Sequence, residues 1–422
     1  MKKRDFLKNM SLMSFGLPFS LLNLDKLIAP YQDLSSEAIA SDEDFWQIIR
    51  QGYTLKDEYI NLENGYYCIL PEETLEHYIK HIREVNLQGS YYMRTVQWEN
   101  RKKSAAMLAE MAGCSTEELV ITRNTTEALD LVIAGINWQA GDEAVMAEQD
   151  YGAMLNQFTL METRHGITAK RISLPNHPKN DEEIVDLYAS AITPKTKLLM
   201  VCHMVNITGQ LLPIRKICDM AHAKGVEVMV DGAHAFAQID FNLSDLDCDY
   251  YGTSLHKWLS VPLGAGFLYV KKGKAANLTP LFAEDKRDPD DIYRLNHIGT
   301  HPVATDLAII NAIDFHNKIG IKRKEARLKY LQDYWTSQVR DLPRVNVNTP
   351  AAMDRHGAIG NIGIDGIEPL DLSKRFLEEH KIWTVAIDRI GVKGCRITPN
   401  IYTTPAELDA FVKAIKVLSG NA

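Results

Sequence analysis

The sequence has 422 residues, of which 45% are hydrophobic and 24% are charged, a composition typical of ordinary globular proteins. Its 47 Lys and Arg residues are outnumbered by 55 Asp and Glu residues, so the formal net charge at pH 7 is −8. This balance excludes proteins that hold nucleic acid or anionic lipid on a strongly basic surface, and the length is sufficient for two domains.

The first expected element is an export signal over residues 1–40. A basic start, MKKRDFLK, precedes an apolar stretch from Met10 to Leu22 that is too short to span a bilayer comfortably. Residues 3–8 resemble a twin-arginine signal with lysine in the first arginine position, and Ala38 and Ala40 offer small residues for cleavage. We therefore expect a periplasmic protein. Because one arginine is replaced, an amphipathic N-terminal helix of a cytoplasmic protein remains the alternative.

The cysteines are scattered along the chain and form no CxxC pair, so we expect no metal site. Several of them lie in apolar runs, which predicts buried thiols. Their even number would also permit disulfides in the periplasm, so they do not decide the compartment. The six positions are Cys68, Cys114, Cys202, Cys218, Cys248 and Cys395.

Residues 41–111 predict a short strand followed by helices. Tyr59–Asn61 is the expected strand, and Asn64 and Gly65 form a turn after it. Residues 71–111 have a helical pattern with one interruption around Gly89. Arg94 follows that interruption and could hold a second carboxylate of the substrate, although a surface or interface arginine is the simpler interpretation.

A strand–turn–helix unit is predicted between residues 118 and 136. The strand-like run Glu118–Arg123 leads into the letters NTTEAL, and an apolar helix continues to Ile136. A helix N-terminus presents free backbone N–H groups and partial positive charge, which suit a phosphate. Thr125 and Thr126 would add hydroxyl donors. Taken alone, the same residues could serve only as a helix N-cap.

The stretch from Val226 to Val270 carries the catalytic candidates. Asp231 stands at the end of one strand-like run, and Lys257 follows another. An amine that forms a Schiff base must be unprotonated part of the time, in a pocket that water barely enters, and pyridoxal phosphate needs a carboxylate beside its ring nitrogen. Lys257 and Asp231 would supply these two groups. An isolated motif of this kind also fits a solvated loop lysine and a turn aspartate.

Two segments of this stretch, DGAHA from Asp231 and SLHKW from Ser254, resemble the fold-type I pyridoxal-phosphate enzymes. Within that group the chain is similar to the class V aminotransferase family, and its DGAHA motif resembles the isopenicillin N epimerase-like branch. The similarity covers most of the chain from about Tyr59 onward. It implies pyridoxal 5'-phosphate (PLP) as the cofactor and an amino acid as the substrate.

The resemblance also implies which residues contact the cofactor. The NTTEAL segment matches the family's phosphate cup, with Thr125 and Thr126 in it. Ser254 and His256 match the residues that bind the phosphate beside the lysine. Tyr151 matches an aromatic residue that stacks on the cofactor ring, where it would exclude water from one face.

Four further positions follow from the same resemblance. Asn206 matches an asparagine near the ring hydroxyl, and His234 stands where sulfur-transferring relatives carry a glutamine that touches that hydroxyl. Arg396 matches the arginine that holds the substrate carboxylate, as a guanidinium fork suits. Thr300 matches a threonine that reaches the neighbouring subunit's phosphate, which implies a homodimer.

The expected fold is α/β: a fold-type I PLP-dependent transferase with a mostly parallel, seven-stranded sheet between helices and a smaller α+β C-terminal domain. After the signal at 1–40, we expect residues 41–85 to join the small domain. Residues 86–305 would form the large PLP-binding domain, and residues 306–422 the small domain.

The expected activity is PLP-dependent chemistry at the Cα of an amino acid, with class V aminotransferase as the main hypothesis. An isopenicillin N epimerase-like epimerase or a lyase is the alternative, and a non-catalytic binding protein of the same fold is a third. Cysteine desulfurases carry a nucleophilic cysteine in a loop before the substrate arginine. The corresponding stretch here, Glu378–Asp388, contains none, which disfavours sulfur transfer. The substrate side chain stays open.

Overall fold

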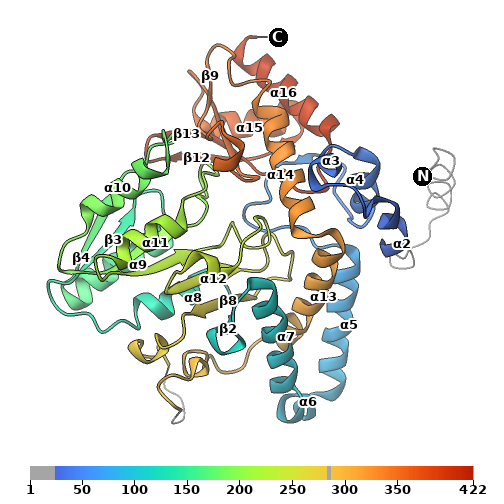
Figure 1. The fold of residues 1–422 in the computed structure, drawn as a ribbon. Coiled ribbons are helices and arrows are strands. Elements are labelled where there is room, and N and C mark those ends of the chain that lie inside the picture. Colours follow the sequence, from blue (N-terminus) through green and yellow to red (C-terminus); the bar gives the residue numbers. More distant parts are fainter. Residues whose placement is uncertain (1–23, 283–286, 422) are drawn as a thin grey trace.

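The computed structural model describes residues 24–282 and 287–421 (Figure 1). A large sheet with helices around it occupies the lower part of that view, and a small antiparallel sheet near the C-terminus occupies the upper part. The expected α/β architecture with a smaller C-terminal α+β domain is confirmed by these two sheets. The exact domain boundaries stay predictions.

Seven strands form the large sheet in the order β2-β8-β7-β6-β5-β3-β4. The pairings from β7 through β4 are parallel, whereas β8 is antiparallel to both of its neighbours. The sheet is therefore mostly parallel, as expected, with one reversed strand. The strands are β2 (Leu119–Thr122), β3 (Glu143–Ala147), β4 (Thr168–Ile172), β5 (Thr196–Cys202), β6 (Glu227–Asp231), β7 (Tyr250–Ser254) and β8 (Gly266–Val270).

The two faces of the sheet pack into two separate cores, because successive side chains of a strand point to opposite faces. Val201 and Val230 belong to the larger core, whereas their neighbours Met200 and Met229 belong to the other. The smaller core is covered by α8 (Thr125–Ile133) and α9 (Gly152–His165). The larger core is covered by α7 (Gln97–Ala112), α10 (Asp181–Ala191), α11 (Ile214–His222) and α12 (Leu243–Leu246).

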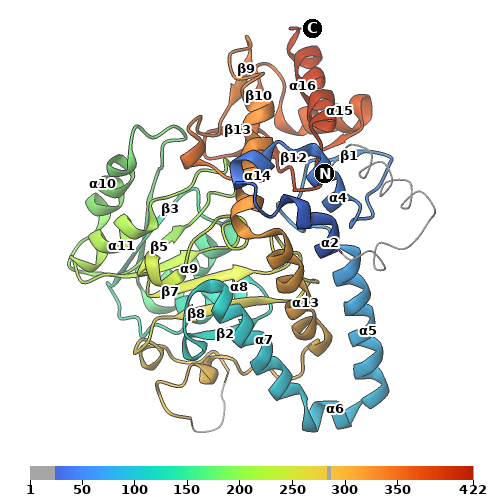
Figure 2. The ribbon, with the colours of Figure 1, turned by 45° about the vertical axis from the view of Figure 1, so that its right-hand side comes forward.

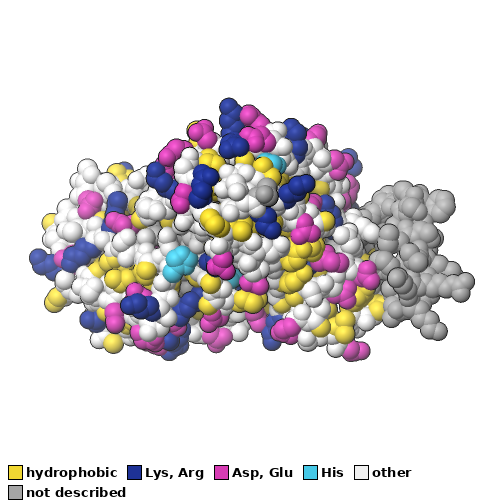
Figure 3. Space-filling view, turned by 90° about the horizontal axis from the view of Figure 1, so that it is seen from above, with side chains coloured by type: hydrophobic (Ala, Val, Ile, Leu, Met, Phe, Trp, Pro, Cys, Tyr) yellow, Lys and Arg dark blue, Asp and Glu magenta, His cyan; other side chains and the backbone are white. Residues whose placement is uncertain are grey.

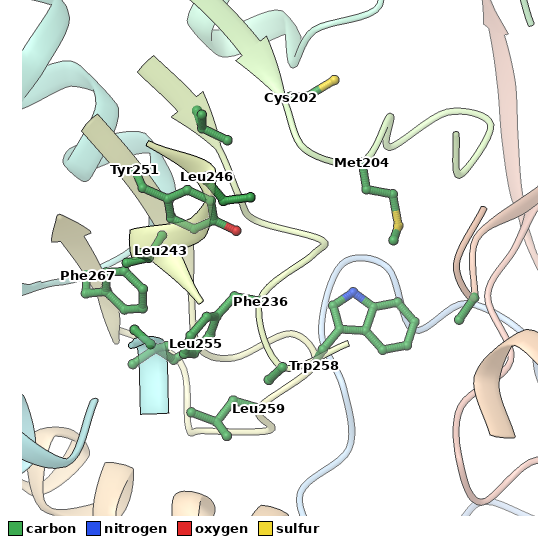
Figure 4. Close-up of a cluster of buried hydrophobic side chains, with 14 of the residues drawn as sticks. Cys202, Met204, Phe236, Leu243, Leu246, Tyr251, Leu255, Trp258, Leu259 and Phe267 are labelled. Atoms are coloured by element: carbon green, nitrogen blue, oxygen red, sulfur yellow. The ribbon is translucent and has the colours of Figure 1, made fainter. Parts of the chain in front are cut away.

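A group of aromatic side chains in the larger core fixes the loop that follows β6 (Figure 4). The rings of Tyr251 and Phe267 lie 6.2 Å apart at 22°. Phe236 meets Phe267 edge to face at 4.9 Å, an arrangement that aromatic pairs favour. Because Phe236 follows β6 while the other two rings belong to β7 and β8, this packing ties the loop to the neighbouring strands.

Four helices form an arm beside the sheet. They are α5 (Glu72–Gln88), α6 (Ser90–Thr95), α7 and α13 (Val303–Ile319), and α13 runs along α5 in both views (Figures 1 and 2). The helical pattern expected over 71–111 is confirmed, as is its interruption: Gly89 has φ +55° and separates α5 from α6. Glycine adopts this left-handed conformation at low cost.

The small domain combines an antiparallel sheet, in the order β12-β13-β10-β9, with three helices. A short strand from the N-terminal part, β1 (Ile60–Asn61), pairs in parallel with β11 (Ile382–Trp383) and joins the segment around residue 60 to this domain. The other elements are β9 (Val345–Val347), β10 (Gly360–Ile364), β12 (Val385–Arg389), β13 (Val392–Ile397), α14 (Ile321–Thr336), α15 (Pro369–His380) and α16 (Pro405–Ser419).

The N-terminal residues that the structure describes pack on the body of the protein. They form α2 (Leu24–Ile28), α3 (Ser36–Ala40) and α4 (Glu43–Arg50). Ala38 and Ala40, which would flank the expected cleavage site, belong to α3, and the carbonyl of Ala40 accepts a hydrogen bond from the Arg327 Nη1 at 3.0 Å. The twin-arginine-like residues lie outside the described residues, so export stays a prediction. Among the helices described, none has the length and apolar character required to cross a membrane.

Charges of both signs are mixed on the described surface that Figure 3 draws. Lys and Arg side chains lie between Asp and Glu side chains there, and apolar side chains separate them. This face therefore presents no broad basic area, which agrees with the net charge of the sequence.

Candidate active site

A cavity of about 380 Å³ lies at the carboxyl ends of β5, β6 and β7. Sheets of this kind bind ligands at that edge, and the volume is within the range of small-molecule sites. The cavity is lined by Gly65, Tyr66, Arg123, Asn124, Thr125, Thr126, Tyr151, Cys202, Met204, Asn206, Asp231, Ala233, His234, Ser254, His256, Lys257, Leu263, Gly264 and Arg396. It thus brings together all the expected site residues except Thr300 and Arg94.

Lys257 is positioned by a tight loop after β7. The loop closes through hydrogen bonds from Val261 N to Leu255 O at 3.0 Å and from Ser260 N to Lys257 O at 2.9 Å. Ser260 has φ +57°, a left-handed conformation that costs a residue with a side chain free energy. The buried Lys324 donates a hydrogen bond to the carbonyl of Trp258 from the far side. This loop leaves little freedom to the backbone of the lysine.

The side chain of Lys257 ends beside His234, with 3.0 Å between Lys257 Nζ and His234 Nε2. Burial lowers the pKa of Lys257 to about 8, and the charge of Arg396 acts in the same direction, while Asp231 partly opposes both. The amine is therefore neutral far more often near neutral pH than an ordinary lysine is, and the neutral state is the one that a nucleophile or a general base requires.

His234 is buried, and its pKa lies well below the ordinary value because of that burial and of the nearby charges of Lys257 and Arg396. The ring is therefore neutral. When the ammonium of Lys257 donates to Nε2, the ring proton resides on Nδ1. The Nδ1 atom is buried and has no hydrogen-bond partner within the described residues.

Asp231 is the last residue of β6, and its carboxylate is buried. Oδ1 accepts a hydrogen bond from Ala233 N at 3.0 Å. Burial raises the pKa of Asp231, and this hydrogen bond and the charge of Lys257 oppose the rise. The next residue must be glycine, because a Cβ at Gly232 would lie 1.9 Å from the ring of Tyr251.

The N-terminus of α8 forms the opposite wall. Asn124 caps the helix through its Oδ1, which accepts from Glu127 N at 2.9 Å. Thr125 contacts Ser254 through its amide N–H at 2.9 Å and its hydroxyl at 2.7 Å. Asn124 thus caps the helix, while Thr125 and Thr126 line the cavity. The expected contact of the two threonines with a phosphate stays a prediction. The partial positive charge of such a terminus suits an anion.

His256 lies between this wall and the lysine. Its Nδ1 atom is buried without a hydrogen-bond partner in the described chain. Burial and the charge of Lys257 lower the pKa of His256 to about 4. A buried ring nitrogen without a partner costs free energy, and a ligand in the cavity that His256 lines would offer it one.

Arg396, in β13, reaches the cavity from the small domain. Its Nε donates to Glu63 Oε2 at 3.1 Å and its Nη2 to Glu63 Oε1 at 2.5 Å, while its Nη1 donates to the carbonyl of Asn206 at 3.2 Å. Asn206 was expected to contact a ligand; here its backbone orients the arginine while the residue lines the cavity. The partner Glu63 was not expected from the sequence.

Three of the expected contact residues, Tyr151, Thr300 and Arg94, lie at the rim of the cavity or outside it. Tyr151 lies at its rim and is 46% exposed. Thr300 is exposed and does not line the cavity of its own chain, so its expected role in a neighbouring subunit stays a prediction. Arg94 is exposed on α6, the helix at the tip of the helical arm in Figure 1. It does not line the cavity of its own chain, which contains Arg396.

The structure adds residues that the sequence analysis did not single out. Tyr66 and Leu263 line the cavity and are exposed. Both lie in loops, where no helical or strand periodicity of the sequence indicates a role for a residue. Cys202 also lines the cavity, but burial raises its pKa well above the ordinary value. Of the six cysteines, five are buried and Cys114 is half-buried, and all are free thiols, so the expectation of buried thiols is confirmed for most of them.

The residues present fit PLP. An amine with a lowered pKa, a buried carboxylate and a helix N-terminus with an unpartnered histidine beside it share one cavity. These are the groups that an imine linkage, a ring nitrogen and a phosphate require.

Solved structures share this fold. The apo structure of a cysteine desulfurase from Thermococcus onnurineus NA1 superposes with a TM-score of 0.78 at 20% identity, over 89% of this chain and 98% of the other. A NifS-like protein matches with a TM-score of 0.72 at 19% identity, over 86% of this chain and 100% of the other. The expected fold-type I architecture is confirmed by these matches.

Sequence relatives carry two kinds of name. Isopenicillin N epimerase of Streptomyces clavuligerus is 27% identical over 399 residues, which are 89% of this chain and 99% of that protein. A cysteine desulfurase of Haloferax volcanii is 28% identical over 335 residues, which are 73% of this chain and 76% of that protein. The relatives thus favour the epimerase-like alternative over the specific expectation of an aminotransferase.

The model of the family described as aminotransferase class-V matches residues 70–411. With a cavity that suits the cofactor and a match over most of its length, this chain belongs to the class-V aminotransferase family of PLP-dependent enzymes.

Proposed function

We propose that this protein exchanges the proton on the Cα of an amino acid and acts as an isopenicillin N epimerase-like epimerase. The observation that carries the proposal is the lowered pKa of Lys257, about 8, in a cavity shared with Asp231 and Arg396. A base with a pKa near the working pH is the efficient catalyst of proton transfer.

The cofactor would be held by groups at three sides of the cavity. Lys257 would hold its aldehyde carbon and Asp231 its ring nitrogen. The α8 terminus, with Thr125, Ser254 and His256, would hold its phosphate. Bound there, PLP supplies an electron-accepting ring that stabilises the charge left when a Cα proton departs.

The protein would contribute the positioning and the proton transfer. Arg396 would hold the substrate carboxylate through N–H groups that Glu63 and Asn206 leave free. Lys257 Nζ would remove the Cα proton from one face, and inversion would require a second acid of the cavity, His234 or the Tyr151 hydroxyl, to return a proton to the opposite face. Tyr151, at the rim, would cover one face of the site.

The choice of epimerisation rests on the relatives and on what the cavity lacks. The epimerase of Streptomyces clavuligerus matches over nearly its whole length. A reactive cysteine requires a lowered thiol pKa. Sulfur transfer is therefore disfavoured, because burial raises the pKa values of the Cys202 and Cys395 thiols. Transamination is the other outcome that the same residues could serve, because it begins with the same proton removal.

The test is to incubate the PLP-loaded protein with single L- and D-amino acids in deuterated water. An epimerase inverts the chiral centre, incorporates deuterium at Cα and releases no 2-oxo acid, whereas an aminotransferase releases an oxo acid and converts the cofactor to its amine form. The Lys257→Ala variant should lose at least about a thousandfold in rate. If the variant and the parent bind amino acids equally and neither turns them over, the protein is a binding protein and the proposal is wrong.

A further inference from the structure

The substrate arginine already has a carboxylate partner inside the protein. Glu63 and Arg396 are both buried, and they form a two-point ion pair with distances of 3.1 Å and 2.5 Å. Glu63 follows β1, and Arg396 belongs to β13, so the pair crosses between the N-terminal segment and the small domain. The inference below rests on the proposed role of Arg396 as the carboxylate anchor.

Glu63 occupies only one edge of the guanidinium group. The group has two edges that can grip a carboxylate: the side edge, Nε with Nη2, and the end edge, Nη1 with Nη2. Glu63 binds the side edge, and the Asn206 carbonyl takes one N–H of Nη1. Of the five N–H donors, one on Nη1 and one on Nη2 remain for a ligand.

The backbone of Gly65 also packs against the flat face of the Arg396 guanidinium group. A Cβ at Gly65 would lie 2.8 Å from Arg396 Cζ and 2.9 Å from Nη2, so the backbone of Gly65 lies directly against the guanidinium plane. Gly65 and Arg396 line the cavity, whereas Glu63 does not. A ligand therefore meets the arginine with its side edge covered.

Glu63 also changes the charge that a ligand meets. Arg396 lowers the pKa of Lys257, and Glu63 raises it, so both charges act on the cavity with opposite signs. A carboxylate that enters meets a nearly neutral pair in place of a free cation. Its attraction to the subsite is weaker than the attraction to an unpaired arginine would be.

We propose that Glu63 is a specificity-determining residue of the carboxylate subsite: it restricts Arg396 to end-on recognition of a single substrate carboxylate and weakens that contact by neutralising the arginine. The substrate is then held less by its carboxylate than in a site with a free arginine, and the remaining contacts with its side chain decide which amino acid binds.

The test measures binding of propionate, a carboxylate that lacks an amine and cannot react, and of the uncharged propionamide. Calorimetry of the PLP-loaded protein supplies both dissociation constants without turnover. In Glu63→Gln, the amide oxygen can still accept from the side edge, but the negative charge is gone. Propionate should bind about tenfold more tightly, and propionamide should bind as it does to the parent.

A matched control is available in Glu43, which grips the buried Arg327 through both carboxylate oxygens outside the cavity. Glu43→Gln should lower the unfolding temperature without changing the affinity for propionate. If Glu63→Gln behaves like Glu43→Gln, the Glu63 pair only stabilises the fold and the inference is overturned.

A second variant keeps the inference testable if Glu63→Gln does not fold. Gly65→Ala leaves every charge in place but pushes a methyl group against the guanidinium plane, so propionate should bind several-fold more weakly while propionamide is unaffected. Unchanged propionate binding would refute the fixed orientation. Because neither variant is judged by turnover, a failed epimerase assay and a failed binding test are separate results.

Discussion

The lysine amine is the residue-scale feature from which the chemistry follows. An exposed lysine has a pKa near 10.4, whereas burial beside Arg396 lowers the pKa of Lys257 to about 8. Burial makes the largest contribution to this shift, and the charge of Asp231 only partly opposes it. The neighbourhood therefore prepares the amine for attack before any ligand arrives.

This lowered pKa predicts the pH dependence of cofactor capture by the apoprotein. Only the neutral amine attacks an aldehyde, so the rate should rise about tenfold per pH unit below pH 8 and level off above it. Stopped-flow absorbance of added PLP at a series of pH values measures this midpoint. A free lysine-like model amine under the same conditions should still be rising at pH 9, and a protein midpoint near 10 would contradict the lowered pKa.

At the scale of elements, the N-terminus of α8, where we propose that the phosphate binds, lies close to the passing strand β8. A Cβ at Gly266 would lie 2.8 Å from Asn124 Cα and 2.5 Å from Thr253 O. Both neighbours are backbone atoms that cannot rotate away. The reversed strand β8 therefore lies in close backbone contact with the start of α8 and limits where that helix N-terminus can lie.

Gly266→Ala should therefore weaken cofactor binding by at least about tenfold, because the added methyl group displaces the α8 terminus from Ser254. Fluorescence or absorbance titration with PLP measures the change. Gly152→Ala is the matched control, since its added Cβ has no neighbour closer than 3.6 Å. Equal PLP affinity in the two variants would show that β8 does not position the wall.

For the whole molecule, the match of Thr300 to a threonine that reaches a neighbouring subunit predicts a second copy of the chain. Thr300 is exposed and lies outside the cavity of its own chain. Large apolar side chains on the helical arm, Leu87, Tyr91 and Trp98, are also exposed. A neighbouring subunit that covered such side chains would bury apolar surface, and we expect a homodimer with shared sites.

Mixing a Thr300→Ala chain with a Lys257→Ala chain tests whether the two subunits share their sites. Thr300→Ala should lower PLP affinity, and Lys257→Ala should abolish activity. In a mixed dimer, the site with the intact lysine receives the intact threonine from the other chain, so half of the sites should regain parent affinity. Activity and cofactor release after co-refolding measure the recovery. No recovery, or a monomer in sedimentation, would contradict shared sites.

Local patterns in the sequence predicted the residues of the candidate active site. The runs that end at Asp231 and lead into Lys257 are short and apolar, so their ends could be placed from the sequence. The carboxyl ends of parallel strands meet at one edge, and the NTTEAL turn opens a helix there. The local sequence around Asp231, Lys257 and the NTTEAL turn is therefore sufficient to predict that these three groups lie close together.

Edge strands and distant contacts were decided only by the tertiary structure. The strand β4 carries half-exposed and exposed residues at the sheet edge, so it lacks the apolar run that identifies a buried strand. The Glu63–Arg396 pair joins residues 333 positions apart. No local pattern encodes such a pair, because its geometry arises when β1 pairs with β11 and β10 with β13. The sequence thus determined which chemistry is possible, while the packing of separate segments decided the charge and the orientation that a substrate meets.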